Sequence, residues 1–125
     1  MTLSEIYLKA AAVIRTNGHA KGDFYNSFAS PVGIARGTCE WPVCAAGALS
    51  VVIFEDPYPP AEGGEGRAEF DAVVARLNAC IEDLHLYGFQ GEPPVMRLAG
   101  WNDAEERTAD DVIAAFERAA AEVAA

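Results

Sequence analysis

The stretch 41–54 contains no charged residue and constrains the fold more than any other part of the chain. It is too short to cross a bilayer, so it predicts a helix buried in a protein core. Pro42 suits a first helical turn, because the N–H that proline lacks would have no partner there. The residues at 45–48 are alanines and one glycine, which allow other backbones to approach closely. We therefore expect a central helix over 42–54.

Three further stretches repeat apolar residues with the spacing of amphipathic helices. They cover about 3–16, 67–87 and 108–123. The first starts at a capping box, in which the Thr2 side chain accepts from the backbone N–H of Glu5 and the Glu5 side chain accepts from the backbone N–H of Thr2. With the central helix, these stretches predict a mainly α fold, a compact bundle of four principal helices.

Glycines, prolines and short polar residues interrupt the helical pattern over 18–40. A loop of this length in a small domain needs anchors, and Phe24, Tyr25 and Phe28 can supply them. We expect an ordered loop that packs across one end of the bundle. A short strand near 32–35 fits the sequence.

Two other segments lie between the helices. Three prolines and two glycines at 55–64 exclude a helix and predict an exposed linker. The segment 95–101 fits either a short strand or a short helix, and we favour the helix.

The length and charge of the chain limit the number of domains and the kinds of partner that it can have. Its 125 residues fit a single domain over 1–125 that needs no metal or disulfide to fold. Nine basic and nineteen acidic residues give a net charge of -10. Such a surface repels a phosphate backbone or an anionic membrane, so we expect no nucleic acid and no membrane among its partners.

Three cysteines, an odd number, follow no secretory signal, which indicates a reduced, cytoplasmic protein. One of them, Cys44, falls near the start of the expected central helix, where the helix dipole can stabilise a thiolate. His19 with Asn102 or Asp103 could complete a Cys-His-Asn or Cys-His-Asp set. The alternative interpretation is that Cys44 is a small buried hydrophobic residue, which its apolar neighbours favour.

Metal ligation is not expected. Cys39 and Cys44 form a single Cys-x4-Cys pair, without the second close pair that zinc sites use, even if His19 and Cys80 are added. Glu82 precedes one histidine by three residues, but a di-iron bundle needs that unit twice. We expect no metal and no other cofactor.

A polar segment surrounds one large aromatic side chain at 101–108. On the structural interpretation, Trp101 anchors the last helix in the core, while Asn102 caps backbone groups and Arg107 pairs with a nearby acid such as Asp103. On the functional interpretation, Trp101, Asn102, Asp103 and Arg107 form a binding corner.

Two motifs carry a resemblance to a known family: Cys44-Ala45-Ala46-Gly47-Ala48, and Trp101-Asn102-Asp103 followed by Arg107-Thr108. Over nearly its whole length the chain resembles a family of small uncharacterised proteins from actinobacteria and their phages. The family is classed as a domain of unknown function, so the resemblance implies a genomic setting and no activity.

Two functional hypotheses follow from the sequence. The first is a small acidic, non-enzymatic interaction or regulatory protein, phage-encoded in one version, that binds a protein partner. The alternative is a thiol-dependent hydrolase or transferase that uses Cys44 with His19. An apolar helix face can also be shared between subunits, so a homo-oligomer stays open.

Overall fold

The computed structural model describes residues 1–26, 38–89 and 91–124, and these residues form a mainly helical protein, as predicted. Within these ranges the α-helices are α1 (Leu3–Asn17), α2 (Ala45–Phe54), α3 (Arg67–Asn78), α4 (Pro94–Asn102) and α5 (Ala109–Ala124). Two short 3-10 helices accompany them, η2 (Thr38–Glu40) and η3 (Leu84–Leu86). The described residues form no β-strand, only isolated bridges from Val43 to His19 and Tyr25. The helix favoured near 95–101 is confirmed as α4, the short helix that accompanies the other four in these ranges.

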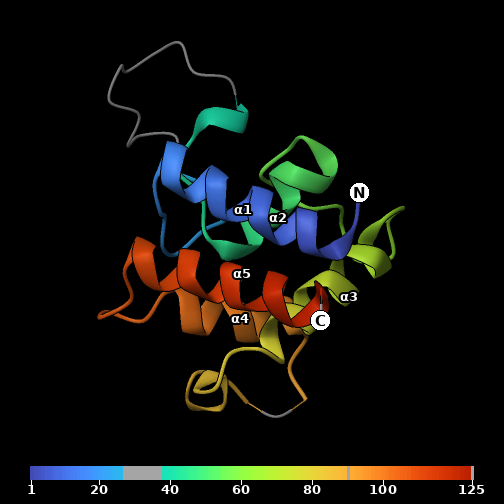
Figure 1. The fold of residues 1–125 in the computed structure, drawn as a ribbon. Coiled ribbons are helices and arrows are strands. Elements are labelled where there is room, and N and C mark those ends of the chain that lie inside the picture. The colour runs from blue at the N-terminus through green and yellow to red at the C-terminus, as the bar shows by residue number, and fades with distance from the viewer. Residues whose placement is uncertain (27–37, 90, 125) are drawn as a thin grey trace.

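The first and last helices form an antiparallel pair (Figure 1). The rings of Tyr7 and Phe116 stack between them with centroids 6.4 Å apart. Near the start of α1, the Ser4 hydroxyl donates to the Ala120 carbonyl at 3.0 Å. The capping box predicted at the start of α1 is confirmed, since the Thr2 hydroxyl accepts from the Glu5 N–H at 3.1 Å.

Helix α2 is the central helix, because it packs against α1, α3 and α4 and its residues 45–50 are all buried. The predicted start at residue 42 is wrong. Pro42 precedes an extended residue, Val43, whose N–H donates to the Gly18 carbonyl at 3.2 Å and whose carbonyl accepts from the Ala20 N–H at 2.9 Å. Because the loop uses both backbone groups of Val43, the helix begins only at Ala45.

Helix α3 ends at Asn78, so the predicted helix over 67–87 is too long. After it the chain continues in tighter turns, in which the N–H groups of Ile81 and Leu84 reach carbonyls three residues earlier. A 3-10 turn repeats every three residues, so Ile81 and Leu84 still point into the core. An apolar residue at every third or fourth position therefore fits both the α-helix and the tighter turns that follow it.

The first part of the predicted loop, residues 18–26, packs across the start of α2 as expected. Two of its predicted anchors are confirmed: Phe24 contacts the ring of Tyr58, and Tyr25 contacts the ring of Trp41, each with centroids 5.0 Å apart. The third anchor, Phe28, and the strand expected near 32–35 lie outside the described residues.

The segment 55–64 is not the fully exposed linker that its prolines predicted. Pro57 and Pro59 are buried, because the chain here folds back onto the protein, where Tyr58 packs on the ring of Phe24. The Ser50 hydroxyl of α2 donates to the Asp56 carbonyl and holds this turn in place. Across the described residues, no helix has both the length and the apolar character needed to cross a membrane.

Candidate functional site

Asn102, the last residue of α4, is completely buried and joins three parts of the chain. Its Oδ1 accepts from the Ala45 N–H at 2.9 Å and lies 2.8 Å from Nε2 of His19. Its Nδ2 donates to the Ala20 carbonyl at 3.0 Å and to Oδ1 of Asp103 at 2.9 Å. All four hydrogen bonds that a side-chain amide can make are present, so α4 is tied to both the loop and the start of α2.

These contacts fix the protonation of His19. Asn102 Oδ1 is an acceptor, so the neutral imidazole must carry its proton on Nε2 and leave Nδ1 unprotonated. The pKa of His19 lies below its ordinary value, first because the ring is partly buried, although the hydrogen bond to Asn102 opposes that effect. His19 is therefore neutral at pH 7.

Cys44 is the N-cap of α2, and not the third helical residue that the sequence suggested. Its Sγ accepts from the Gly47 N–H at 3.3 Å. The helix start was expected to lower the thiol pKa, but burial outweighs that contact and raises the pKa of Cys44 to about 12. At neutral pH the side chain is a protonated thiol, which is a poor nucleophile.

Gly47 explains why the loop can lie so close to α2. A Cβ at this position would be 2.1 Å from the Phe24 carbonyl oxygen, closer than any side chain allows. That oxygen is held in place, because it accepts from the Cys44 N–H at 3.0 Å. The spacing Cys44-x-x-Gly47 therefore combines a helix cap with a crossing point for the loop.

Of the residues considered to act with Cys44 in thiol catalysis, the structure brings His19 and Asn102 into direct contact. In the described part of the chain, no hydrogen bond joins either of them to the thiol of Cys44. The structure thus contains the His-Asn half of such a set beside a capped, buried cysteine.

Trp101 and Arg107 pack on each other near Asn102. The Arg107 guanidinium lies 4.0 Å from the centroid of the Trp101 ring, and its Nε donates to the Trp101 carbonyl at 2.9 Å. Asp83 accepts from the Trp101 indole N–H at 3.2 Å and lies 3.8 Å from Arg107. The predicted partners of Arg107 were other acids, and the structure places it beside Asp83 and Asp111.

Asp103 is the exposed member of this polar segment. Its Oδ1 accepts from the Gly22 N–H at 3.0 Å, which continues the link between α4 and the loop. Lys21 adds to this link, because its ammonium group donates to the Ala104 carbonyl at 2.7 Å. Trp101 and Asn102 are buried, so Asp103 is the member of the Trp-Asn-Asp motif that faces solvent.

Beside Asp103 runs a groove of about 540 Å³, which we call the apolar groove. Three large hydrophobic side chains line it and are mostly exposed: Leu86 at 67%, Phe89 at 80% and Met96 at 54%. Glu92 and Asp103 add negative charge to its lining. Isolated exposed hydrophobic residues are common, but three around one groove indicate an interaction surface.

Sequence reasoning missed the apolar groove. Leu86 was assigned to the helix expected over 67–87, and Phe89 was given no role. A signal was present, because Leu86 lies off the apolar stripe that continues through Ile81 and Leu84. Only the end of α3 at Asn78 and the position of α4 show that Leu86 and Met96 line one groove.

The cysteines and histidines considered as metal ligands make separate contacts. The Cys39 thiol donates to the Glu55 carbonyl at 3.0 Å, and the Cys80 thiol donates to Glu122 at 2.8 Å. Nδ1 of His85 lies 3.2 Å from the backbone carbonyl of Glu82, not from its carboxylate. In residues 1–26, 38–89 and 91–124, no three Asp, Glu, His or Cys side chains are grouped so that they could hold a metal ion.

The fold and these contacts define a class: a mainly helical protein in which one buried asparagine joins a loop, the start of the central helix and the end of α4. The chain belongs to a family of unknown function (DUF6197), whose model matches residues 1–122. No curated protein matches the chain, and no solved structure matches it.

Proposed function

We propose that the protein is a non-enzymatic interaction module that binds a protein partner through the apolar groove. The observation that carries this proposal is the exposure of Leu86, Phe89 and Met96 around one groove. Burying such side chains against a partner removes apolar surface from water, which is the main driving force of association. The Trp-Asn-Asp motif supports the groove, because Asp103 is part of its lining and the Asn102 amide donates to the Asp103 carboxylate. Arg107 in turn bonds to the Trp101 carbonyl.

The partner that fits is a segment with apolar side chains flanked by lysine or arginine. Glu92 and Asp103 line the groove, and the whole chain carries a net charge of -10. An acidic surface attracts a basic partner and repels nucleic acid, anionic membranes and a second copy of this chain. We also propose that the protein acts in the cytoplasm. Its origin in an actinobacterium or a phage, which the two motifs suggested, is part of the same proposal.

The test is a titration with a synthetic amphipathic helix that carries leucine on one face and lysine on the other. We expect saturable NMR shifts at the groove, and binding about 10-fold weaker for Leu86→Ser, as for loss of an interface anchor. Leu8→Ser is the matched control, because Leu8 is an exposed leucine of α1 outside the groove. A charge-reversed helix with glutamate in place of lysine should bind more weakly.

Equal binding of both helices, or equal effects of Leu86→Ser and Leu8→Ser, would contradict this assignment. Concentration-dependent association of the protein alone would indicate a second copy as the occupant instead.

The alternative, a thiol-dependent hydrolase or transferase using Cys44 with His19, draws support from the contact between His19 and Asn102. Alkylation of the native protein, followed by peptide mass spectrometry, separates the two proposals. We expect Cys39, which is exposed, to label quickly and Cys44 to stay protected until the protein unfolds. Rapid labelling of Cys44 at neutral pH would favour the enzyme.

A further inference from the structure

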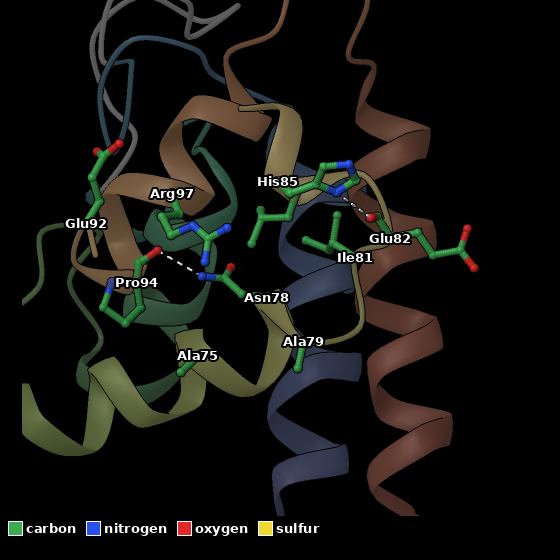
Figure 2. Close-up of a pocket in the computed structure, with 10 residues that line it drawn as sticks. Ala75, Asn78, Ala79, Ile81, Glu82, His85, Glu92, Pro94 and Arg97 are labelled. Atoms are coloured by element: carbon green, nitrogen blue, oxygen red, sulfur yellow. Dashed lines mark hydrogen bonds between the residues drawn. The ribbon is translucent and has the colours of Figure 1, made fainter. Parts of the chain in front are cut away.

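A second cavity, of about 420 Å³, lies between α3, η3 and α4. Figure 2 shows the Arg97 side chain of α4 reaching into it and facing the Asn78 amide at the end of α3. Ile81, Leu84 and Pro94 contribute apolar walls. The apolar groove shares Glu92 with this cavity, which we call the Arg97 cavity, but has a different lining otherwise.

Arg97 differs from the other partly buried cations of the described chain. Arg67 bonds to the Asp71 carboxylate at 2.8 Å and to the Pro60 carbonyl at 2.9 Å. Arg107 donates to a carbonyl, and although its Nη2 also lacks a hydrogen-bond partner, two carboxylates lie within 4.0 Å of its guanidinium and balance its charge. The Arg97 side chain makes no hydrogen bond or ion pair with any described residue, and its Nε is buried without an acceptor. A partly desolvated guanidinium without a counter-charge is costly, so this position calls for an anionic partner.

The acidic side chains near Arg97 do not serve as that partner. Glu92 turns away from the guanidinium, and its carboxylate accepts from the Phe89 N–H instead (Figure 2). The carboxylate of Glu82 points out of the cavity on the far side (Figure 2). In a chain with nineteen acidic and nine basic residues, an arginine that faces a cavity without an acid is unusual.

Asn78 adds a second unpartnered atom to the same wall. Its side chain is about nine-tenths buried, and its Nδ2 donates to the Pro94 carbonyl at 3.0 Å. That bond fixes the amide, yet its Oδ1 has no donor among the described residues. Buried polar atoms are nearly always paired in proteins, so an unpaired donor on Arg97 and an unpaired acceptor on Asn78 point to a bound molecule that offers both an acceptor and a donor.

We propose that the Arg97 cavity binds a small monocarboxylic acid with an apolar body and one hydroxyl or N–H group, whose carboxylate accepts from Arg97 and whose hydroxyl or N–H donates to Asn78 Oδ1. A guanidinium presents parallel N–H groups that match the two oxygens of a carboxylate. A single cation among acidic neighbours favours one negative charge over the two of a phosphate ester. The apolar walls of Ile81, Leu84 and Pro94 cover the remainder of the ligand.

The test is an NMR titration of the ¹⁵N-labelled protein with benzoate, and with benzamide as a neutral molecule of the same shape. The Arg97 Nε–H and the Asn78 amide protons report on the cavity directly. We expect saturable shifts of both with benzoate at millimolar concentration, and smaller shifts with benzamide. Arg97→Met should weaken benzoate binding by about 10- to 100-fold, the range for loss of hydrogen bonds to a charged group.

Arg118→Met is the matched control, because Arg118 is an exposed arginine of α5 outside the cavity. Thermal unfolding of each variant confirms that it is folded, and Arg97→Lys keeps the charge if the methionine variant is unstable. Benzoate shifts that are absent, that match those of benzamide, or that persist in Arg97→Met would overturn the proposal. If the amphipathic helix used to test the apolar groove does not bind, the proposal for the Arg97 cavity still stands, because that helix probes only the apolar groove.

Discussion

Two ends of α4 show opposite uses of polar groups. At its C-terminal end, Asn102 makes all four of its hydrogen bonds and is completely buried. At its N-terminal end, Arg97 and Asn78 leave buried atoms unpaired, and Leu86 and Phe89 expose apolar surface nearby. A saturated polar network fixes one arrangement of the chain, whereas unpaired groups around an opening leave binding capacity for something else. Asn102 of the motif that stands out in the sequence belongs to the first kind, and the candidate binding surfaces belong to the second, although Asp103 of the same motif lines the apolar groove.

The largest loss of stability should come from replacing Asn102, which makes all of its possible hydrogen bonds. In Asn102→Ala, the Ala45 N–H and the Ala20 carbonyl lose their partner inside the protein. Each such group costs roughly 1–3 kcal/mol, so we expect the free energy of unfolding to fall by about 3 kcal/mol or more. Urea unfolding measures this change. Asp103→Ala, at the exposed neighbour, is the control and should cost about 1 kcal/mol. Equal losses would mean that Asn102 does not have the central role assigned to it.

A smaller difference in stability should distinguish substitutions at two glycines: Gly47, near the Asn102 network, and Gly88, near Arg97. In Gly47→Ala the new Cβ meets the Phe24 carbonyl oxygen at 2.1 Å, and the loop must move. Overpacking of this kind costs about 1–3 kcal/mol. In Gly88→Ala the nearest atoms lie at 3.5 Å, an ordinary contact, so thermal unfolding should change little. A Gly47→Ala variant as stable as the parent would show that the loop is not fixed against α2.

The smallest effect concerns pH and His19. Burial lowers the pKa of His19 in the folded protein, whereas the unfolded chain keeps a value of about 6.5. Below that pH the unfolded chain binds the proton more readily, so the free energy of unfolding falls as the pH drops from 7 to 5. His19→Gln keeps a donor for Asn102 but does not titrate, and its stability should change less over this range. Parallel denaturation curves for the two proteins at every pH would remove His19 as the cause.

The sequence was informative where local rules decide the structure. The capping box at Thr2, the buried central helix and the helix near 95–101 follow from spacing and residue type, and the structure confirms them. The sequence was misleading where hydrogen bonds to a distant segment replace those of a regular helix. Helix α2 starts late because Val43 bonds to the loop, and α3 stops early at Asn78.

The candidate site could be predicted only in part. The sequence offered His19 with Asn102 or Asp103 as possible partners of Cys44 without showing that any of them meet, and the structure places His19 Nε2 2.8 Å from Asn102 Oδ1. Burial of Cys44, which decides the direction of its pKa shift, depends on the loop crossing above it. The Arg97 cavity left no sign in the sequence, because an arginine without a partner looks like any other surface arginine until its neighbours are placed.

The pairing of α1 with α5 determines when the fold can be completed. The hydrogen bond from Ser4 to Ala120 joins residues 116 positions apart, so the two helices meet only after nearly all of the chain between them is available. During synthesis the apolar face of α1 must wait for α5, because α2 and α3 cover only part of it earlier. Contacts of such long range close slowly, because ordering the intervening chain costs entropy before the contact forms. The rate-limiting step of folding should therefore be the docking of α5.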